Sequence, residues 1–504
     1  MPASRPDVDA AFDLLVIGAG PAGLAAAAAA ATSGLERVAL LDAGSRPGGQ
    51  FWRHRKGDTG RGHHDWRRFQ DLVGALRRHQ RLGVVRYLPD HPVWHLEPSA
   101  DGGFTAHVVH GGAARELQAR AVVIATGAYD RQLPFPGWAL PGVFTAGAVQ
   151  ALLKGQGVLA GRRIVVSGTG PFLLPVAASL VSAGADVAAV LEANRPSGAA
   201  RHPVVLARNR AKVAEAAAYL ATLARHRVPY HTGRAVVAAH GEGEVHSVTS
   251  AALDADWRIV AGSEQRIACD AVAVGFGFTP QVELAADLGC AMALDADGSL
   301  VVTVDAAQQS SVEGAFVAGE ACGVGGQALA LVEGEIAGVA AAARLSGANP
   351  APSADLARRR EGLRAFAALL PRLWPVRPGW QTWLADDTLV CRCEEVPAAA
   401  IRAAVTELGA SDARGAKLFS RAGMGACQGR ICGSPAACLT AEALGRGVTA
   451  DDLSAHARRP IAWPITLGAL AADDALPRDA TAHLSTPAAH DPPAAEPQSE
   501  EAPA

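Results

Sequence analysis

Four cysteines in the last quarter of the chain are spaced as two close pairs. Cys391 and Cys393 stand one residue apart, and Cys427 and Cys432, which follow 33 residues later, have four residues between them. Four thiols in two close pairs, set among glycines, can hold a metal centre. An iron–sulfur cluster accepts four thiolates at family-specific spacings, whereas paired cysteines on zinc usually have about two to four residues between them. The spacing favours a cluster and leaves zinc open.

The other four cysteines form no such pattern and are predicted to be packing residues: Cys269, Cys290, Cys322 and Cys438. Eight cysteines are few for 504 residues. The clustering of four of them near the C-terminus indicates a metal or redox site in a reducing compartment and disfavours a fold held together by disulfides. The N-terminus has no basic region followed by an apolar core and a cleavage site, so no signal peptide is predicted. We therefore expect a cytoplasmic protein.

A second group of residues, near the N-terminus, has the spacing of a dinucleotide-binding unit. An apolar run ends in GAGPAG at residues 18–23, an alanine-rich segment follows, and a second apolar run ends at Asp42. Gly18 permits the tight turn, Gly20 lets the backbone approach a pyrophosphate, and Gly23 lets the helix lie close to the strand. The helix N-terminus offers unpaired N–H groups to the phosphates. Asp42, 24 residues after Gly18, is placed to bind the ribose hydroxyls.

Residues 161–192 repeat this pattern, and Glu192 again follows the first glycine, Gly168, by 24 residues. We interpret the repeat as an internal duplication of the supersecondary unit. Leu173 stands where a third glycine would allow close packing of helix and strand, so a nicotinamide dinucleotide is expected to bind poorly or not at all, and NAD(P) binding stays open. Glu192, if used, would favour NAD over NADP, because a carboxylate repels a 2'-phosphate.

Three further segments are placed where a bound dinucleotide would meet the backbone again. A glycine-rich loop follows Asp42, a buried strand over 121–126 ends in a glycine, and a strand near 314–318 leads to a glycine, an acid and a small-residue helix from about residue 327. The acid is placed to meet the ribityl chain of a flavin, with the helix N-terminus near the ring. The candidate residues are Gly49, Gln50, Thr126, Gly127, Gly319 and Glu320.

Length and charge limit the class of protein. A chain of 504 residues is too long for one hydrophobic core, so about two to four domains are expected. The 46 basic and 49 acidic residues give no sign of nucleic-acid binding. Two uncharged stretches, 14–31 and 164–185, are long enough to imitate membrane spans, but both contain GxGP and are typical of buried strand–turn–helix units. The chain is not predicted to cross a membrane, and peripheral association stays open.

With these residues identified, the chain resembles a known family. The segments GAGPAG, PGGQ, ATGAYDR, PGWALPGVFTAGAVQALLKGQG and FVAGEACGVGGQ resemble the two-dinucleotide-domain flavoprotein reductases. The cysteine spacing resembles the bacterioferritin-associated-ferredoxin (BFD) type of [2Fe-2S] domain. The combination is similar to the alpha subunits of heteromeric amino-acid dehydrogenases, which include opine oxidases, proline and hydroxyproline dehydrogenases and the corresponding subunit of hydrogen cyanide synthase. The resemblance covers about residues 10 to 470.

The resemblance implies two cofactors and a partner. A [2Fe-2S] cluster would be held by Cys391, Cys393, Cys427 and Cys432. FAD would be held by Gly18, Gly20, Gly23, Asp42, Gly49, Gln50, Thr126, Gly127, Gly319 and Glu320. A partner subunit with its own flavin would oxidise the amine, and a small ferredoxin-like subunit could complete the complex. A flavin accepts two electrons together and releases them singly, whereas the cluster carries one at a time, so one chain with both would convert between the two. No residue is identified as a catalytic acid or base.

The fold class expected is α/β, with two dinucleotide-binding (Rossmann-like, glutathione/thioredoxin-reductase-like) domains and a small helical BFD-like [2Fe-2S] domain. The FAD-binding domain is expected to be discontinuous, because the chain leaves it and returns. The expected divisions are 10–130 and 294–345 for the FAD-binding domain, 135–290 for the second dinucleotide-binding-like domain, 346–385 for a linker, 386–445 for the BFD-like domain, 446–474 for a C-terminal extension and 475–504 for a disordered tail.

Two other functions stay open at this point. One is a stand-alone NAD(P)H-dependent flavoprotein reductase that passes electrons to a ferredoxin or quinone, which Leu173 disfavours. The other is a non-catalytic chain whose C-terminal module is stabilised by zinc and used for assembly. Thioredoxin-reductase chemistry is disfavoured, because the second domain contains no CxxC dithiol.

Overall fold

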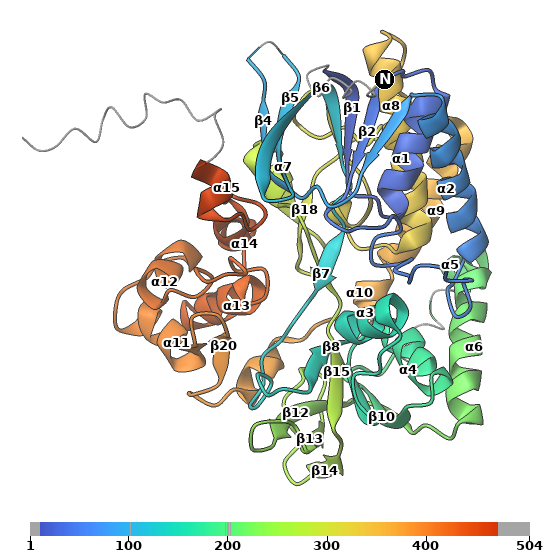
Figure 1. Cartoon of the computed structure of the whole chain (residues 1–504). Helices are drawn as coiled ribbons and strands as arrows, with labels where there is room; N and C mark the ends of the chain where they lie inside the picture. The colour runs from blue at the N-terminus through green and yellow to red at the C-terminus, as the bar shows by residue number, and fades with distance from the viewer. Residues whose placement is uncertain (1–10, 101, 197, 199–200, 202, 472–504) are drawn as a thin grey trace, which may run out of the picture.

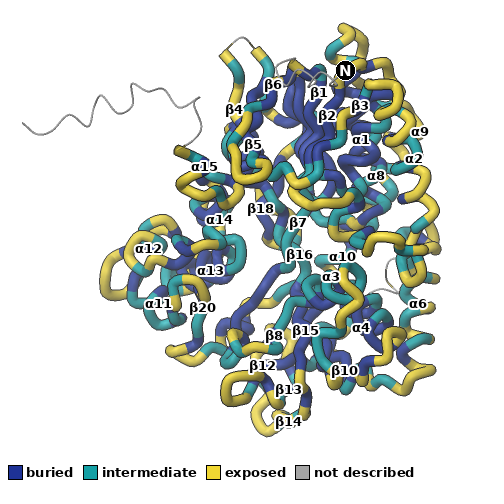
Figure 2. Tube along the Cα trace, viewed as in Figure 1, coloured by how far each residue is buried: buried dark blue, intermediate teal, exposed yellow. Residues whose placement is uncertain are grey.

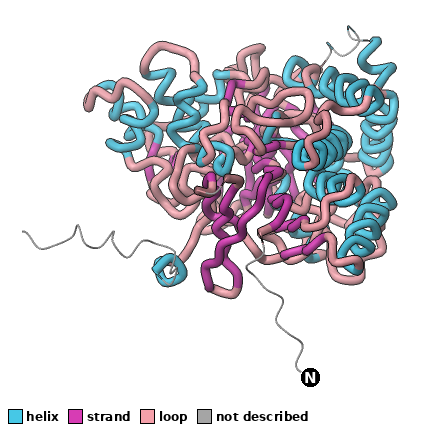
Figure 3. The backbone as a smooth tube through the Cα atoms, turned by 90° about the horizontal axis from the view of Figure 1, so that it is seen from above, coloured by secondary structure: helices cyan, strands magenta, loops and turns pink. Residues whose placement is uncertain are grey.

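The computed structural model describes residues 11–100, 102–196, 198, 201 and 203–471. Two α/β parts lie one above the other in Figure 1, and a helical part lies beside them. Seen from above, the strands run through the middle of the molecule and helices gather at both sides (Figure 3). The predicted disordered tail, 475–504, lies outside the described residues.

The first sheet is organised around β1 (Phe12–Ile17), which is almost fully buried. β1 pairs in parallel with β2 (Val38–Leu41) on one side and with the long strand β6 (Ala113–Ile124) on the other. β3 (Val85–Leu88) extends the parallel part beyond β2, and β19 (Ala315–Val317) extends it beyond β6. The apolar runs become buried strands because helices cover a parallel sheet on both faces, and Figure 2 shows these strands buried.

The other half of β6 belongs to an antiparallel ribbon. It pairs with β5 (Phe104–His110), which pairs in turn with β4 (Val93–Pro98). The two short alternating runs at 93–97 and 104–109 therefore form strands as the sequence suggests. They are continuous with the main sheet, because β6 runs through both parts.

The second sheet repeats the first. Its parallel strands, in spatial order, are β11 (Tyr230–Thr232), β10 (Asp186–Glu192), β9 (Arg163–Gly168), β15 (Ala271–Gly275) and β8 (Val143–Thr145). An antiparallel sheet of β12 (Arg234–His240), β13 (Ser247–Ala252) and β14 (Gln265–Ala268) comes between β11 and β15 along the chain, as β4 and β5 come between β3 and β6 in the first part. The unit of β9, α4 (Leu173–Ser182) and β10 corresponds to β1, α1 (Pro21–Thr32) and β2. The predicted duplication is confirmed.

Small residues bring the helices of the first part into close contact. The alanine-rich helix α1 packs along α8 (Gln327–Leu345). A methyl group at Gly334 or Gly338 would lie 2.0 or 2.2 Å from a carbonyl oxygen of α1. The two backbones are therefore nearly in contact, which only glycine allows.

Two crossing strands join the α/β parts. β7 (Ala128–Asp130) leaves the first part and pairs antiparallel with β16 (Phe278–Pro280), which returns to it (Figure 1). The chain then completes the first part with α7 (Glu283–Asp287), the hairpin of β17 (Met292–Leu294) and β18 (Leu300–Val302), and β19. The expected departure and return of the chain is present.

The remaining described segments are mostly helical. The second part carries α3 (Ala146–Gln156), α5 (Pro203–Arg208) and α6 (Arg210–Arg225). A connecting segment contains α9 (Ala354–Ala367), α10 (Leu370–Leu373) and the 3-10 turn η3 (Pro378–Trp383). The helical part contains β20 (Leu389–Cys391), β21 (Val396–Pro397), α11 (Ala398–Thr406), α12 (Ala413–Ser420), α13 (Gly433–Ala443), α14 (Ala450–Ala457) and α15 (Leu467–Ala471).

The basic stretch from Arg53 to Arg81 is only partly the solvated helix and loop that its composition suggests. Helix α2 (Trp66–Arg81) exposes its arginines. The loop before it is held by an aromatic group, because the rings of Trp66 and Phe69 pack on those of His54 and His63. Burial of this apolar area holds the loop in place. In the described part of the chain, no helix has the length and hydropathy needed to span a membrane.

Candidate functional site

The glycines predicted to hold a dinucleotide converge at the carboxyl end of the first sheet. A methyl group on Gly18 would lie 2.3 Å from the carbonyl oxygen of Ala125, and one on Gly23 would lie 1.7 Å from that of Gly18. Gly49 faces Gly20 so closely that its own methyl group would lie 2.9 Å from the Gly20 Cα. The loop from β1 to α1 and the glycine-rich loop therefore form one narrow cradle of backbone.

Asp42 lies at the end of β2 beside this cradle. Its carboxylate accepts hydrogen bonds from the backbone N–H of Ala19 and, at 2.6 Å, from that of Gly44. Burial raises the pKa of Asp42, and the two amides oppose that rise. The side chain keeps partial exposure to solvent. The carboxylate is thus fixed at the edge of the cradle, where ribose hydroxyls of a nucleotide bind in this kind of fold.

The other predicted residues of the first site lie around the same strand ends. Thr126 donates its hydroxyl to the carbonyl of Gln281 at 2.7 Å, and Gly127 has a positive φ of 80° just before β7. A methyl group on Gly319 would lie 3.1 Å from the Ala22 Cβ, so the return segment packs against α1. Gln50 is exposed, and its side-chain oxygen accepts a hydrogen bond from Arg53.

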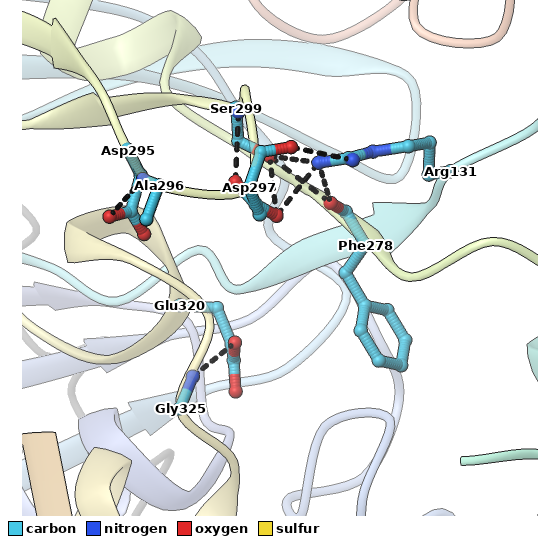
Figure 4. Close-up of polar contacts among 8 residues, drawn as sticks. All are labelled: Arg131, Phe278, Asp295, Ala296, Asp297, Ser299, Glu320 and Gly325. Atoms are coloured by element: carbon cyan, nitrogen blue, oxygen red, sulfur yellow. Dashed lines mark hydrogen bonds and ion pairs between the residues drawn. The ribbon is translucent and has the colours of Figure 1, made fainter. Parts of the chain in front are cut away.

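Glu320 lies between β19 and α8 and points toward the start of that helix (Figure 4). Its carboxylate accepts hydrogen bonds from the N–H groups of Gly325 at 3.2 Å and Gly326 at 2.9 Å. Burial raises the pKa of Glu320 to about 7. Gln327, the first residue of α8, follows Gly326 and is 5% exposed. Neither polar atom of its side chain has a hydrogen-bond partner among the described residues.

Gln327 is the site residue that sequence reasoning missed. The sequence marks it only as the start of a helix, although a buried amide at a helix N-terminus needs a partner. A flavin ring supplies carbonyl and ring-nitrogen groups of the required kind. The backbone cradle, the two acids and this unpartnered amide together fit a bound flavin dinucleotide.

Arg131 fixes the strands that leave this site. Its guanidinium donates to the carbonyl of Asp297 at 2.9 Å, to that of Phe278 at 3.1 Å and to the Ser299 hydroxyl, and it pairs with the Asp297 carboxylate at 2.8 Å (Figure 4). The side chain is 8% exposed. A buried arginine whose two terminal nitrogens are both hydrogen-bonded holds one geometry, so β7 and β16 cross in a fixed position.

The second dinucleotide unit has the same elements, but its acid is closed off from solvent. Glu192 is fully buried. Its carboxylate accepts the Thr169 hydroxyl at 2.7 Å and the N–H groups of Gly170 and Asn194, each at 2.9 Å. The carboxylate therefore has three partners within the protein, whereas Asp42 in the first site has two and remains partly exposed.

A segment from far along the chain covers this second site. Asn194 donates its side-chain amide to Thr169 at 2.7 Å and to the carbonyl of Pro375 at 2.9 Å. Just beyond Pro375, Trp383 is 4% exposed, its indole N–H donates to the carbonyl of Trp257, and the two rings stack. The connecting segment thus lies over the end of β10, where a nicotinamide dinucleotide would place its adenosine ribose.

The buried acid predicts a pH dependence of stability. Burial raises the pKa of Glu192 from 4.5 to about 7, so between those pH values the folded chain holds a proton that the unfolded chain has released. The contribution of this group to the free energy of unfolding therefore falls as the pH rises through this window, by about 3 kcal/mol. The melting temperature of Glu192→Gln relative to the wild type should rise across the same window. If the melting temperatures of the variant and the wild type kept a constant difference from pH 4.5 to 7, the assignment would be wrong.

The four predicted cysteines come together in the helical part. Cys391 ends β20 and Cys432 precedes α13, and both are buried, whereas Cys393 is exposed. The thiol of Cys432 contacts those of Cys391 and Cys427, and Cys427 also contacts Cys393. The four thiols are therefore linked by contacts in the order Cys393–Cys427–Cys432–Cys391, and we call this linked group the row. The other four cysteines are free thiols outside this row: Cys269, Cys290, Cys322 and Cys438.

Neighbouring groups favour the thiolate form at two cysteines of the row, Cys391 and Cys427. Contact with the Cys432 thiol, together with the backbone N–H groups of Gly423 and Glu394, lowers the pKa of Cys391 to about 6. Contact with Cys432 also lowers the pKa of Cys427, while the pKa of Cys432 itself is raised. Thiolates are the form that binds metal, and N–H donors at sulfur are typical of iron–sulfur sites.

The row offers four thiols to a metal centre. Within the described ranges, no group of three or more His, Cys, Asp or Glu side chains is arranged to hold one metal ion. A tetrahedral zinc needs its four ligands to converge on one point, whereas a cluster with two irons can take two thiolates at each end. Four thiols supply the two thiolates needed at each end of such a cluster.

Comparison with known proteins agrees with this geometry. Residues 12–345 match the pyridine nucleotide-disulphide oxidoreductase family, and residues 389–441 match the BFD-like [2Fe-2S] binding domain. An opine oxidase subunit from Agrobacterium tumefaciens is 34% identical over 489 residues, which cover 92% of each chain. Hydrogen cyanide synthase subunit HcnB of Pseudomonas aeruginosa is 32% identical over 426 residues, covering 83% of this chain and 90% of the relative.

One solved structure extends the match to the overall fold. The crystal structure of L-proline dehydrogenase from P. horikoshii superposes with a TM-score of 0.65 at 21% identity, and the match covers 92% of this chain and 79% of that one. At this identity the likeness shows the fold alone. It confirms the predicted fold class, in which two Rossmann-like parts are joined to a helical BFD-like domain.

Proposed function

Because the chain belongs to the pyridine nucleotide-disulphide oxidoreductase family and carries a BFD-like [2Fe-2S] domain, we propose that it is the electron-transfer subunit of a heteromeric amine- or amino-acid-oxidising complex. The chain is an FAD- and [2Fe-2S]-containing oxidoreductase whose relatives include named subunits of such enzymes. The proposed partner is a second, FAD-containing subunit that oxidises the amine, and a small ferredoxin-like subunit is proposed to join them. The proposed location is the cytoplasm, which suits eight free thiols.

We assign the FAD to the first site. Gly18, Gly20, Gly23 and Gly49 would line the pyrophosphate, and Asp42 would bind the ribose. The rest of the assigned set is Gln50, Thr126, Gly127, Gly319 and Glu320, to which the geometry adds Gln327. The cluster is assigned to Cys391, Cys393, Cys427 and Cys432.

The proposed division of the chain follows the two cofactors. The FAD-binding domain would comprise 10–130 and 294–345, and the second dinucleotide-binding-like domain 135–290. The linker 346–385 would lead to the BFD-like domain, 386–445, and the extension 446–474. These divisions are supported by β7 and β16, which are the crossing points between the two sheets.

One observation favours an electron-transfer subunit and disfavours a stand-alone NAD(P)H-dependent reductase. Glu192 has its carboxylate bonded within the protein, and Pro375 and Asn194 cover it. A nicotinamide dinucleotide would have to displace this segment and its buried tryptophans. The chain would therefore receive electrons from a partner and not from NAD(P)H.

The residues then have defined tasks. When bound, FAD exchanges two electrons at once or one at a time, and the cluster carries single electrons. The cradle of glycines binds the dinucleotide through backbone N–H groups, which only close approach permits. Glu320 accepts the N–H groups of Gly325 and Gly326 at the start of α8 and so holds this turn beside the site. Arg131 fixes the strands that lead from the site to the second α/β part.

The covered second site predicts a specific result with reduced nucleotides. Excess NADH or NADPH, added without air to the purified holoprotein, should leave the flavin absorption unchanged, because the adenosine ribose has no open carboxylate to bind. An amine substrate should bleach it only when the partner subunit is present. Rapid bleaching by NADH alone would favour the stand-alone reductase, and a chain fully active alone with amines would exclude the subunit role.

A further inference from the structure

Each pair of cysteines encloses an arginine, and both arginines reach out of the helical part. Arg392 lies between Cys391 and Cys393, and Arg430 lies between Cys427 and Cys432. The cysteine spacing alone gives neither side chain a role. Both contact the segment that follows the flavin site, residues 129–138.

Arg430 uses every edge of its guanidinium. Its Nε donates to the Tyr129 hydroxyl at 2.8 Å, its Nη1 to the carbonyl of Cys427 at 3.1 Å, and its Nη2 to the carbonyl of Ala462. One rigid side chain thus joins a cysteine of the row to strand β7 and to the C-terminal extension. Tyr129 lies two residues after Gly127, which belongs to the proposed flavin site.

A buried group of charges holds this arginine in place. Glu283 on α7 lies 3.4 Å from Arg430 and 3.6 Å from Arg459. The three side chains are only 6 to 9% exposed. Because two arginines face one carboxylate, the group carries a net positive charge. In a site shielded from water, such a charge acts strongly on a neighbouring anion.

Arg392 makes the matching contact from the other pair. Its guanidinium lies over the ring of Trp138, 4.3 Å from the centroid, and donates to the Gln132 side chain at 3.3 Å. The indole N–H of Trp138 donates in turn to the carbonyl of Leu389, two residues before the first cysteine. Both cysteine pairs are therefore held against the same segment, residues 129–138.

We infer that Arg430 and Arg392 are positioning residues that clamp the cluster-binding loops to the strand leaving the flavin site, and so fix the path between the two cofactors. The inference deepens the function proposed above and rests on it. Single electrons pass along this path, and no bond is made or broken. The positive group beside the row also favours the reduced cluster, which carries one more negative charge than the oxidised one.

Lysine cannot replace arginine in this role. A lysine ammonium keeps the charge but lacks the planar fork that reaches three partners at once. Arg430→Lys therefore separates position from charge, and Tyr129→Phe removes a single hydrogen bond while keeping the ring. Arg414→Gln, at an exposed position on α12, removes the same charge from the same domain without touching the clamp.

The test measures electron transfer and cluster properties in the full chain. Iron and sulfide content, the electron paramagnetic resonance (EPR) signal of the reduced cluster and its midpoint potential are determined first. The flavin is then photoreduced without air, and reduction of the cluster is timed. Tyr129→Phe and Arg430→Lys should slow this step about tenfold with iron content unchanged, within the about 10- to 100-fold effect of losing an outer-shell partner. Arg430→Gln should also lower the midpoint potential, and Arg414→Gln should change neither value.

The possible outcomes are distinct. Wild-type transfer rates in both Tyr129→Phe and Arg430→Lys would overturn the inference. So would loss of the cluster in Arg430→Lys with unchanged transfer in Tyr129→Phe, since the arginine would then serve assembly alone. A wild-type chain that lacked one of the two cofactors would instead refute the proposed function.

Discussion

Replacing Cys432 by serine is expected to remove the iron–sulfur centre and leave the flavin in place. Cys432 is 1% exposed, and its sulfur contacts those of Cys391 and Cys427. Serine offers a harder, shorter oxygen ligand in place of a soft thiolate. Iron and acid-labile sulfide per chain should fall at least about tenfold, because even outer-shell partners change metal affinity by about 10- to 100-fold. The flavin absorption of the same sample serves as an internal reference.

Cys438→Ser is the matched control for this experiment. Cys438 lies on α13, six residues further along the same segment and outside the row of thiols, so its variant should keep wild-type iron. Wild-type iron and sulfide in Cys432→Ser would show that the four-thiol assignment is wrong. Zinc in the wild-type chain, without iron or sulfide, would instead support the non-catalytic function, in which a zinc-stabilised C-terminal module serves assembly.

Replacing Gly23 by alanine is expected to release the flavin. The added methyl group would lie 1.7 Å from the Gly18 carbonyl oxygen, which is backbone and cannot move aside alone. Helix α1 would have to shift off the strand and carry its N-terminal N–H groups away from the pyrophosphate. Overpacking costs about 1–3 kcal/mol, so FAD binding should weaken about 10- to 100-fold. Flavin content after gel filtration and fluorescence titration of the apoprotein measure this loss.

Gly74→Ala tests the same substitution where there is space. Gly74 lies in α2, and the nearest atom to its added methyl group would be a side-chain nitrogen of Arg78 at 3.8 Å. Flavin content should stay at the wild-type value, and the helix should gain up to about 1 kcal/mol. If Gly23→Ala also kept its flavin, the N-terminal unit would not be the FAD site.

The two dinucleotide units show how one sequence pattern can have two outcomes. Both have a strand, a glycine turn, a helix, a second strand and an acid at the same offset. In the first unit Asp42 remains partly exposed, and in the second Glu192 is covered. The difference comes from Asn194 and Pro375, which are 181 positions apart and form a hydrogen bond across the site.

The sequence by itself determined the fold class, the duplication, the two strand–turn–helix units and the grouping of the four thiols. Its glycines, acids and cysteine pairs act over a few consecutive residues, because a strand–turn–helix needs Gly18 and Gly23 at fixed spacing and a close pair of thiolates needs only a short loop. The tertiary structure alone decided that the connecting segment covers the second site, that Gln327 is left without a partner among the described residues, and that Arg430 joins Cys427 to Tyr129. These contacts join residues far apart along the chain, and their energy comes from burial that no local pattern records.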